Sequence, residues 1–79
     1  MIEMVTGVTF VKVVPGQEKT VHKELLKIKG IQDFYHIFGE FDFIVISKVD
    51  GLSALNKLVD TIRESKNIIA TNTILGAEL

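Results

Sequence analysis

Four segments of the chain carry the hydrophobic pattern of β-strands. They are dense in β-branched and aromatic side chains and fall at residues 8–14, 32–38, 41–47 and 68–75. Pro15 and Gly16 end the first segment, because proline lacks the backbone donor that a strand needs. Only Gly39 and Glu40 separate the second segment from the third, which predicts a tight antiparallel hairpin.

Two segments between the strands change to the helical period. Apolar residues of the first recur at i, i+4 and i+7, at Val21, Leu25 and Ile28. We expect this helix to follow Gly16 and to end at Gly30. The second helix is predicted after Asp50, a residue that can cap it. Its apolar positions are Leu52, Leu55, Leu58, Val59 and Ile62.

The order β-α-β-β-α-β predicts a ferredoxin-like α+β sandwich, a four-stranded antiparallel sheet with two helices on one face. Strict alternation predicts that three of the four strands are apolar on both faces. In the first strand, the two faces carry Val8, Phe10 and Val14 and, opposite them, Val11 and Val13. In the third they carry Phe41, Phe43 and Val45 opposite Ile44 and Ile46, and in the last Ile68 and Ile74 opposite Ile69 and Leu75. An open apolar sheet face is unusual in a soluble monomer. We therefore expect a homodimer in which two sheets stack face to face, with on the order of 10 kcal/mol of apolar burial before association costs.

Length and composition also favour an oligomer. With 79 residues the chain predicts a single domain, 1–79, with its core at about 8–75. A domain of this size buries only about 60–65% of the surface of its unfolded chain. The absence of cysteine excludes disulfides, and two histidines argue against structural zinc. Oligomerisation is the remaining supplement to a small core.

Charge and hydropathy exclude several partners. The net charge of −1 gives no electrostatic footprint for nucleic acid or for an anionic membrane. Apolar runs are too short for a transmembrane helix, and the first residues lack the features of a signal peptide. These observations predict a cytoplasmic protein.

No constellation of residues predicts catalysis, a metal or a cofactor. The serines lack a neighbouring nucleophile signature, and Glu40 and Asp42 are typical of carboxylates that face water at a turn. We therefore expect a protein that is not an enzyme. Two alternatives stay open. One is a small dimeric α/β-barrel enzyme of the cofactor-free oxygenase or isomerase type, with a deep internal pocket near Tyr35 and His36. The other is a purely structural oligomerisation unit.

Two polar segments interrupt the apolar pattern and could hold a ligand. Gly39 can adopt positive φ and allow close approach to the backbone. Phe41 could supply an apolar wall, and Asp42 could accept a hydrogen bond from an ammonium group. The alternative is a glycine turn in which Asp42 binds its own backbone. Thr71 and Thr73 could orient polar ends of a ligand, or could simply belong to a solvent-facing edge strand.

The chain resembles the RAM domain, the effector-binding domain of the Lrp/AsnC transcription regulators. The resemblance covers nearly the whole chain, from about Val8 to Leu75, and is carried by Val11–Gly16, Phe38–Val45 and Ala70–Leu75. Its most specific parts are Gly39-Glu40-Phe41-Asp42, similar to the family's Gly-x-aromatic-Asp turn, and Thr71-Asn72-Thr73, similar to its Thr-x-Thr. Phe41 stands where many relatives carry Tyr.

The resemblance implies sheet-stacked dimers that associate further into rings, often octamers, with small amino-acid effectors bound between dimers. It assigns ligand contacts to Gly39, Glu40, Phe41, Asp42, Thr71 and Thr73. Gly39 would cradle the ligand with its backbone, Asp42 would meet the ammonium, and Asp42→Ala would weaken binding with little loss of fold. The chain has no room for the family's helix-turn-helix. It therefore resembles a stand-alone module that senses an amino acid, or joins the ring of a full-length Lrp/AsnC-type regulator, without direct nucleic-acid binding.

Overall fold

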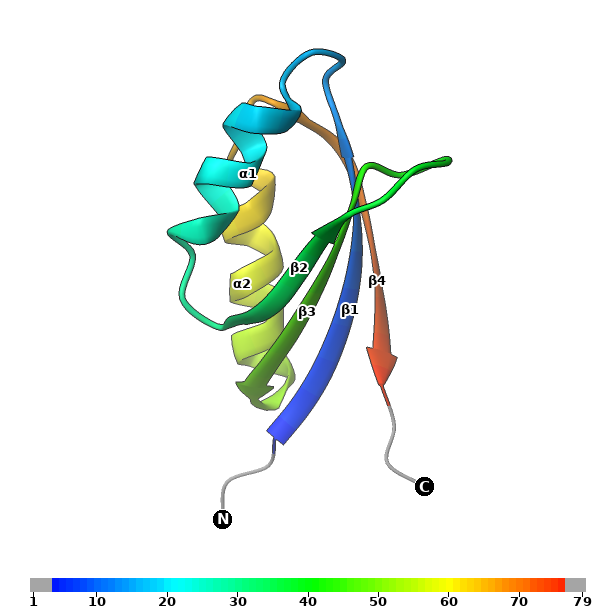
Figure 1. The fold of residues 1–79 in the computed structure, drawn as a ribbon. Helices are drawn as coiled ribbons and strands as arrows, with labels where there is room; N and C mark the ends of the chain where they lie inside the picture. Colours follow the sequence, from blue (N-terminus) through cyan, green and yellow to red (C-terminus); the bar gives the residue numbers. More distant parts are fainter. Residues whose placement is uncertain (1–3, 77–79) are drawn as a thin grey trace.

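The computed structural model describes residues 4–76 and contains the six elements in the predicted order (Figure 1). They are β1 (Met4–Val13), α1 (Glu18–Leu26), β2 (Ile31–His36), β3 (Phe43–Asp50), α2 (Gly51–Arg63) and β4 (Ile68–Gly76). The sheet order is β2-β3-β1-β4, and every pairing is antiparallel. The ferredoxin-like α+β fold is therefore confirmed. Residues 1–3, where the sequence predicts no signal peptide, and residues 77–79 lie outside the described part of the chain.

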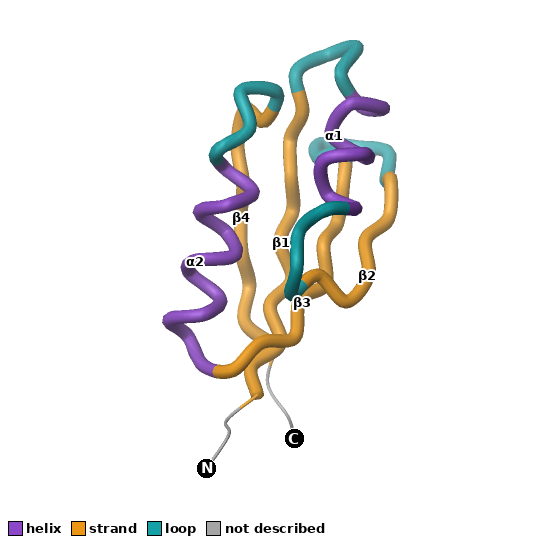
Figure 2. The backbone as a smooth tube through the Cα atoms, turned by 90° about the vertical axis from the view of Figure 1, so that its left-hand side faces the viewer, coloured by secondary structure: helices purple, strands orange, loops and turns teal. Residues whose placement is uncertain are grey.

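Both helices lie side by side on one face of the sheet, as Figure 2 shows. The core between the layers consists of Val11, Val13, Val21, Leu25, Phe43, Val45 and Ile62. Residues of α1 and α2 thus meet the alternate residues of the two central strands, β1 and β3, that point the same way. This arrangement follows from the helical and strand periods of the sequence.

The helices differ from expectation at their ends and on one apolar position. Helix α1 ends at Leu26, and 3₁₀-type bonds from Lys27 and Ile28 tighten its last turn. Gly30 (φ +98°) instead ends the following turn, directly before β2. Asp50 is the N-cap residue of α2, but its side chain makes no capping hydrogen bond. Leu52, predicted on the apolar side of this helix, is 55% exposed.

The β2–β3 connection is longer than the expected two-residue turn. Strand β2 ends at His36 and β3 begins at Phe43. Phe38 lies in the connection and is 92% exposed, and its ring centroid is 5.1 Å from that of His36, on the side that the sequence predicted for both. The Ile37 N–H donates to the Asp42 carbonyl at 2.8 Å and closes a loop over the intervening residues. This loop projects from the side of the sheet opposite the helices (Figure 1).

Two departures from strict alternation correct the predicted sheet faces. Val13 pairs with Ile68 and Lys12 pairs with Ala70, so Ile69 is an extra residue in a bulge. Ile68 consequently packs on the core, whereas Ile74, paired with Val8, lies on the open face. The prediction that Ile68 and Ile74 share a face was wrong.

Phe41 was also predicted on the wrong face. It precedes the start of β3, and its ring lies 5.6 Å from that of Phe10 instead of joining Phe43 in the core. The pairing of Phe10 with Ile44 places both Phe10 and Phe41 on the face away from the helices.

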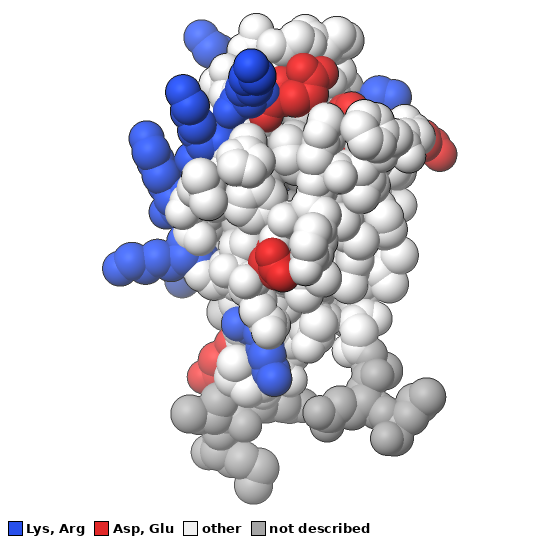
Figure 3. Space-filling view, viewed as in Figure 1, with Lys and Arg blue, Asp and Glu red and all other residues white. Residues whose placement is uncertain are grey.

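The uncovered face of the sheet carries a continuous apolar strip. From the strand registers, it consists of Val8, Phe10, Phe41, Ile44, Ile46 and Ile74. Lys12 and Lys48 lie on the same face, towards its two ends. In Figure 3, most cationic side chains gather over the helices on the left, and the flank on the right is largely uncharged. Within residues 4–76, no helix is long and apolar enough to span a bilayer.

Candidate functional site

Asp42 fastens the β2–β3 loop to β1. Its backbone N–H donates to the Val11 carbonyl at 2.9 Å, and its Oδ2 accepts a hydrogen bond from the Val13 N–H at 2.8 Å. The residue is half-buried. The carboxylate therefore bonds a neighbouring strand and not its own turn. Asp42 has a role in the fold, which corrects the view of it as a dispensable surface-turn residue.

The rest of the predicted turn is accessible. Gly39 has φ +140°, a conformation that strongly favours glycine, and no atom lies within 4 Å of where a Cβ would stand. Glu40 is exposed, and its carbonyl accepts a long hydrogen bond of 3.5 Å from Lys12 Nζ. Phe41 is half-buried against Phe10. The loop thus has an open backbone at Gly39 and, two residues later, an aromatic side chain that packs on β1.

Thr71 and Thr73 lie on the other side of the sheet. They pair with the buried residues Val11 and Thr9, so their side chains share the helix-facing side of β4. The hydroxyl oxygens of Thr73 and Thr9 are 3.0 Å apart and form a hydrogen bond. Thr71 has no such partner among the described residues, and its hydroxyl remains available to a ligand.

The predicted ligand residues do not converge within one copy of the chain. Strand β1 separates the loop from β4, and the loop projects to the open side whereas the threonines face the helices. A single site that uses both groups needs residues from a second copy. The β2–β3 loop and the threonines of β4 are therefore two separate groups in one copy of the chain.

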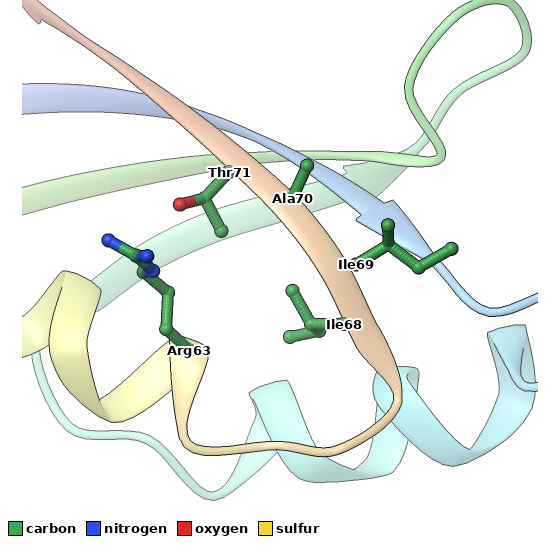
Figure 4. A pocket seen from close by; sticks show the side chains of 5 residues that line it. All are labelled: Arg63, Ile68, Ile69, Ala70 and Thr71. Carbon is green, nitrogen blue, oxygen red and sulfur yellow. The ribbon is translucent and has the colours of Figure 1, made fainter.

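Arg63 was missed by sequence reasoning. A hollow of about 380 Å³ at the edge of β4 is lined by Arg63, Ile68, Ile69, Ala70 and Thr71 (Figure 4). Arg63 ends α2, where a basic residue is typical because of the helix dipole. Its proximity to Thr71 depends on how the α2–β4 connection folds back, which no local pattern encodes.

The histidines lie in a different hollow. His22 and His36, with Phe43 at the base, line an open hollow of about 450 Å³ whose other walls are Glu18, Lys19 and Lys23. Both histidines are exposed, so this is not the deep internal pocket that the enzyme alternative requires.

Tyr35 cannot join His36 in one active site within a chain. Tyr35 pairs with Ile44 of the open face, whereas His36 pairs with Phe43 of the core face. The Tyr35 hydroxyl donates to Asp33, and this bond together with the charge of Asp33 raises the pKa of Tyr35. Among residues 4–76, no three His, Cys, Asp or Glu side chains gather as a metal site would need.

The curated relatives are transcription regulators. The HTH-type transcriptional regulator LysM of Sulfurisphaera tokodaii is 27% identical over 55 residues, which are 70% of this chain and 39% of that protein. LysM of Saccharolobus solfataricus matches to the same extent. The chain thus spans about two fifths of the length of these relatives.

Solved structures share the fold over almost the whole chain. FFRP-DM1 superposes with a TM-score of 0.86 at 28% identity, covering 92% of this chain and 99% of that one. The hypothetical protein PHS023 from Pyrococcus horikoshii superposes with a TM-score of 0.83 at 28% identity, covering 95% of this chain and 92% of that one. AsnC of E. coli shows the same fold, with a TM-score of 0.86 at 14% identity over 95% of this chain and 52% of that one.

The family model described as the Lrp/AsnC ligand binding domain matches residues 6–76, from the first residues of β1 to the end of β4. This match includes the β2–β3 loop, the threonines of β4 and Arg63. The chain therefore belongs to the Lrp/AsnC ligand-binding domain family.

Proposed function

We propose that the chain is a regulatory module, without catalytic activity of its own, that binds a small amino acid between copies of itself. The observation that carries this proposal is the β2–β3 loop, which presents the open backbone of Gly39 beside the fixed carboxylate of Asp42. The match to the Lrp/AsnC ligand binding domain supports effector binding by the chain as a whole.

Asp42 is suited to hold the ammonium group of the ligand. Its hydrogen bond from Val13 engages Oδ2 and fixes the carboxylate, and no described residue occupies Oδ1. A carboxylate held in place forms a charge-assisted hydrogen bond at a low entropic cost. Gly39 and Glu40 would contribute backbone groups at the loop apex, and Phe41 would pack on the aliphatic part of the ligand.

Assembly completes the proposed site. The apolar strip of the open face is the surface that a second copy would cover, giving a sheet-to-sheet homodimer. Further association of dimers, in a ring such as an octamer, would bring the β2–β3 loop of one copy towards the threonines of another. The module would then act alone as a sensor, or modulate a full-length Lrp/AsnC-type regulator by joining its ring, with DNA contacts left to that partner.

A thermal-shift screen of the proteinogenic amino acids tests this function. A ligand at about 100 times its Kd stabilises the folded state by about 2.7 kcal/mol, which gives a clear rise in Tm. Any amino acid that raises Tm is then titrated by calorimetry into wild type, Asp42→Asn and Asp60→Asn. The Asp60 variant removes the same charge from an exposed position on α2.

We expect Asp42→Asn to lose at least about tenfold in affinity, the order of one charge-assisted hydrogen bond, and Asp60→Asn to bind as wild type does. If no amino acid stabilises the folded wild-type protein, the effector-binding function is wrong and a purely structural oligomerisation unit remains. Equal binding by the two variants would remove Asp42 from the site.

A further inference from the structure

We infer that Arg63 and Thr71 form a carboxylate-binding pocket at the outer edge of β4. This inference rests on the proposed function, since it assigns the carboxylate of the amino acid to a part of the chain away from the Asp42 loop. The ligand class is a small carboxylate with a short apolar chain.

The geometry brings two donors together. Arg63 comes from the last turn of α2 and Thr71 from β4, and Figure 4 shows the guanidinium and the Thr71 hydroxyl pointing toward one another across the hollow. The hollow of about 380 Å³ has room for a small organic acid. Ile68 presents its apolar side chain to the hollow, whereas the Ile69 and Ala70 side chains point away from Arg63 and Thr71 (Figure 4).

Arg63 is exposed to solvent, and its guanidinium makes no ion pair or hydrogen bond with another residue in the described part of the chain. No carboxylate of residues 4–76 forms an ion pair with it, and none of its five N–H donors has a hydrogen-bond acceptor there. The neighbouring Glu64 lines a different hollow, beside Glu24 and Ser65. A free guanidinium fork next to a free hydroxyl matches the two oxygens of a carboxylate.

The surroundings make the charge of Arg63 necessary. The carboxyl end of a helix carries partial negative charge and disfavours an anion, so α2 itself would repel a carboxylate here. Arg63 has to outweigh that repulsion, and a neutral replacement should abolish binding. Because β4 is an edge strand, its outer backbone groups have no partner strand among residues 4–76 and can add hydrogen bonds to the ligand.

The test uses a carboxylate without an ammonium group. The ¹⁵N-labelled full chain is titrated with isobutyrate and, in parallel, with the uncharged isobutyramide. We expect isobutyrate to shift the NMR signals of the Arg63 side-chain Nε–H and the Thr71 amide, and isobutyramide to leave both unchanged. Arg63→Gln should weaken the Thr71 response at least about tenfold, as expected for loss of a charge-assisted bond.

Two variants separate binding from folding and from net charge. Lys57→Gln removes a positive charge from an exposed position on the same helix and should leave the response intact. Arg63→Lys keeps the charge at the end of α2 but lacks the fork, so it should preserve Tm and weaken binding. A Thr71 response of equal size in wild type and Arg63→Gln, or no response in wild type, would overturn the inference.

Amino acids identified by the screen give a second readout. Each should bind Arg63→Gln at least about tenfold more weakly than wild type, the size of one charge-assisted bond, and its α-amide derivative should bind wild type equally weakly. An amino acid that binds Arg63→Gln as tightly as wild type overturns the inference and leaves the proposed function intact. Conversely, a response to isobutyrate without any amino-acid binding keeps the pocket and rejects the amino-acid effector.

Discussion

Asp42 fixes the β2–β3 loop and is also the proposed contact for the ligand's ammonium group. One carboxylate oxygen, Oδ2, accepts the Val13 N–H and joins the β2–β3 loop to β1, while the other is directed to no described residue. The loop that is proposed to hold a ligand is thus fixed by the same group that would contact the ammonium. Substitutions at this position must therefore be chosen to separate stability from binding.

Asp42→Ala should lower the free energy of unfolding by about 1–3 kcal/mol, because the half-buried Val13 N–H loses its acceptor. Asp42→Asn retains an acceptor oxygen and should cost less. Urea unfolding of both variants against wild type measures the difference. Equal stability of wild type and Asp42→Ala would show that the Asp42–Val13 bond contributes nothing to the fold.

Removal of two buried hydroxyls should change the free energy of unfolding in opposite directions. Ser47 Oγ is buried and has no hydrogen-bond partner among residues 4–76, whereas Thr9 Oγ1 bonds Thr73. Because an unsatisfied buried polar group is costly, Ser47→Ala should raise the free energy of unfolding by about 1 kcal/mol. Thr9→Val should lower it by a similar amount. Chemical denaturation of both variants and wild type measures these free energies of unfolding. A loss of stability in Ser47→Ala would show that Ser47 Oγ has a partner, such as a bound water.

At the scale of elements, a glycine sets how closely α2 approaches the sheet. Gly7 of β1 lies beneath Leu55 of α2, and a Cβ on Gly7 would stand 2.6 Å from Leu55 Cδ1. Leu55 is buried, so it has little space into which to move. The absence of a side chain at position 7 therefore allows this contact between helix and strand.

Gly7→Ala should destabilise the fold by about 1–3 kcal/mol through overpacking. Leu55→Ala alone should cost about 2–5 kcal/mol, but much less in the Gly7→Ala background, where it relieves the clash. A double-mutant cycle by urea unfolding measures this coupling. Leu52→Ala, at an exposed position of the same helix, serves as the control and should show none. Additive effects of Gly7→Ala and Leu55→Ala would contradict the proposed contact.

At the scale of the whole molecule, one face of the sheet is covered by helices and the other is not. The uncovered face carries aliphatic and aromatic side chains from β1, β3 and β4, together with Phe41 of the loop. A second copy of this chain is the proposed cover. Stability should then depend on protein concentration, since association stabilises the folded state.

Ile46→Lys should convert the dimer into a monomer, because it places a charge in the middle strands of the open face. Leu52→Lys changes an apolar residue that is 55% exposed on α2, and should leave the assembly unchanged. Light scattering after size-exclusion chromatography at micromolar concentration compares them with wild type. A monomeric wild type would contradict the sheet-to-sheet dimer and the sites that depend on it.

The sequence by itself determined the type and order of the elements and most of the core. The reason is local: strand and helix periods are properties of neighbouring residues, and Pro15, Gly30 and Asp50 mark the breaks between them. The family resemblance rested instead on short motifs, above all residues 39–42 and 71–73, and the match over residues 6–76 confirms it. The ligand roles of Gly39, Glu40, Phe41, Asp42, Thr71 and Thr73 stay predictions.

Only the tertiary structure decided which residues face one another. The bulge at Ile69 reversed the face of Ile68, and the bonds of Asp42 to β1 placed Phe41 on Phe10. Arg63 approaches Thr71 because the connection after α2 folds back along β4. Such contacts depend on register and on the packing of elements distant in sequence, so local periodicity carries no record of them.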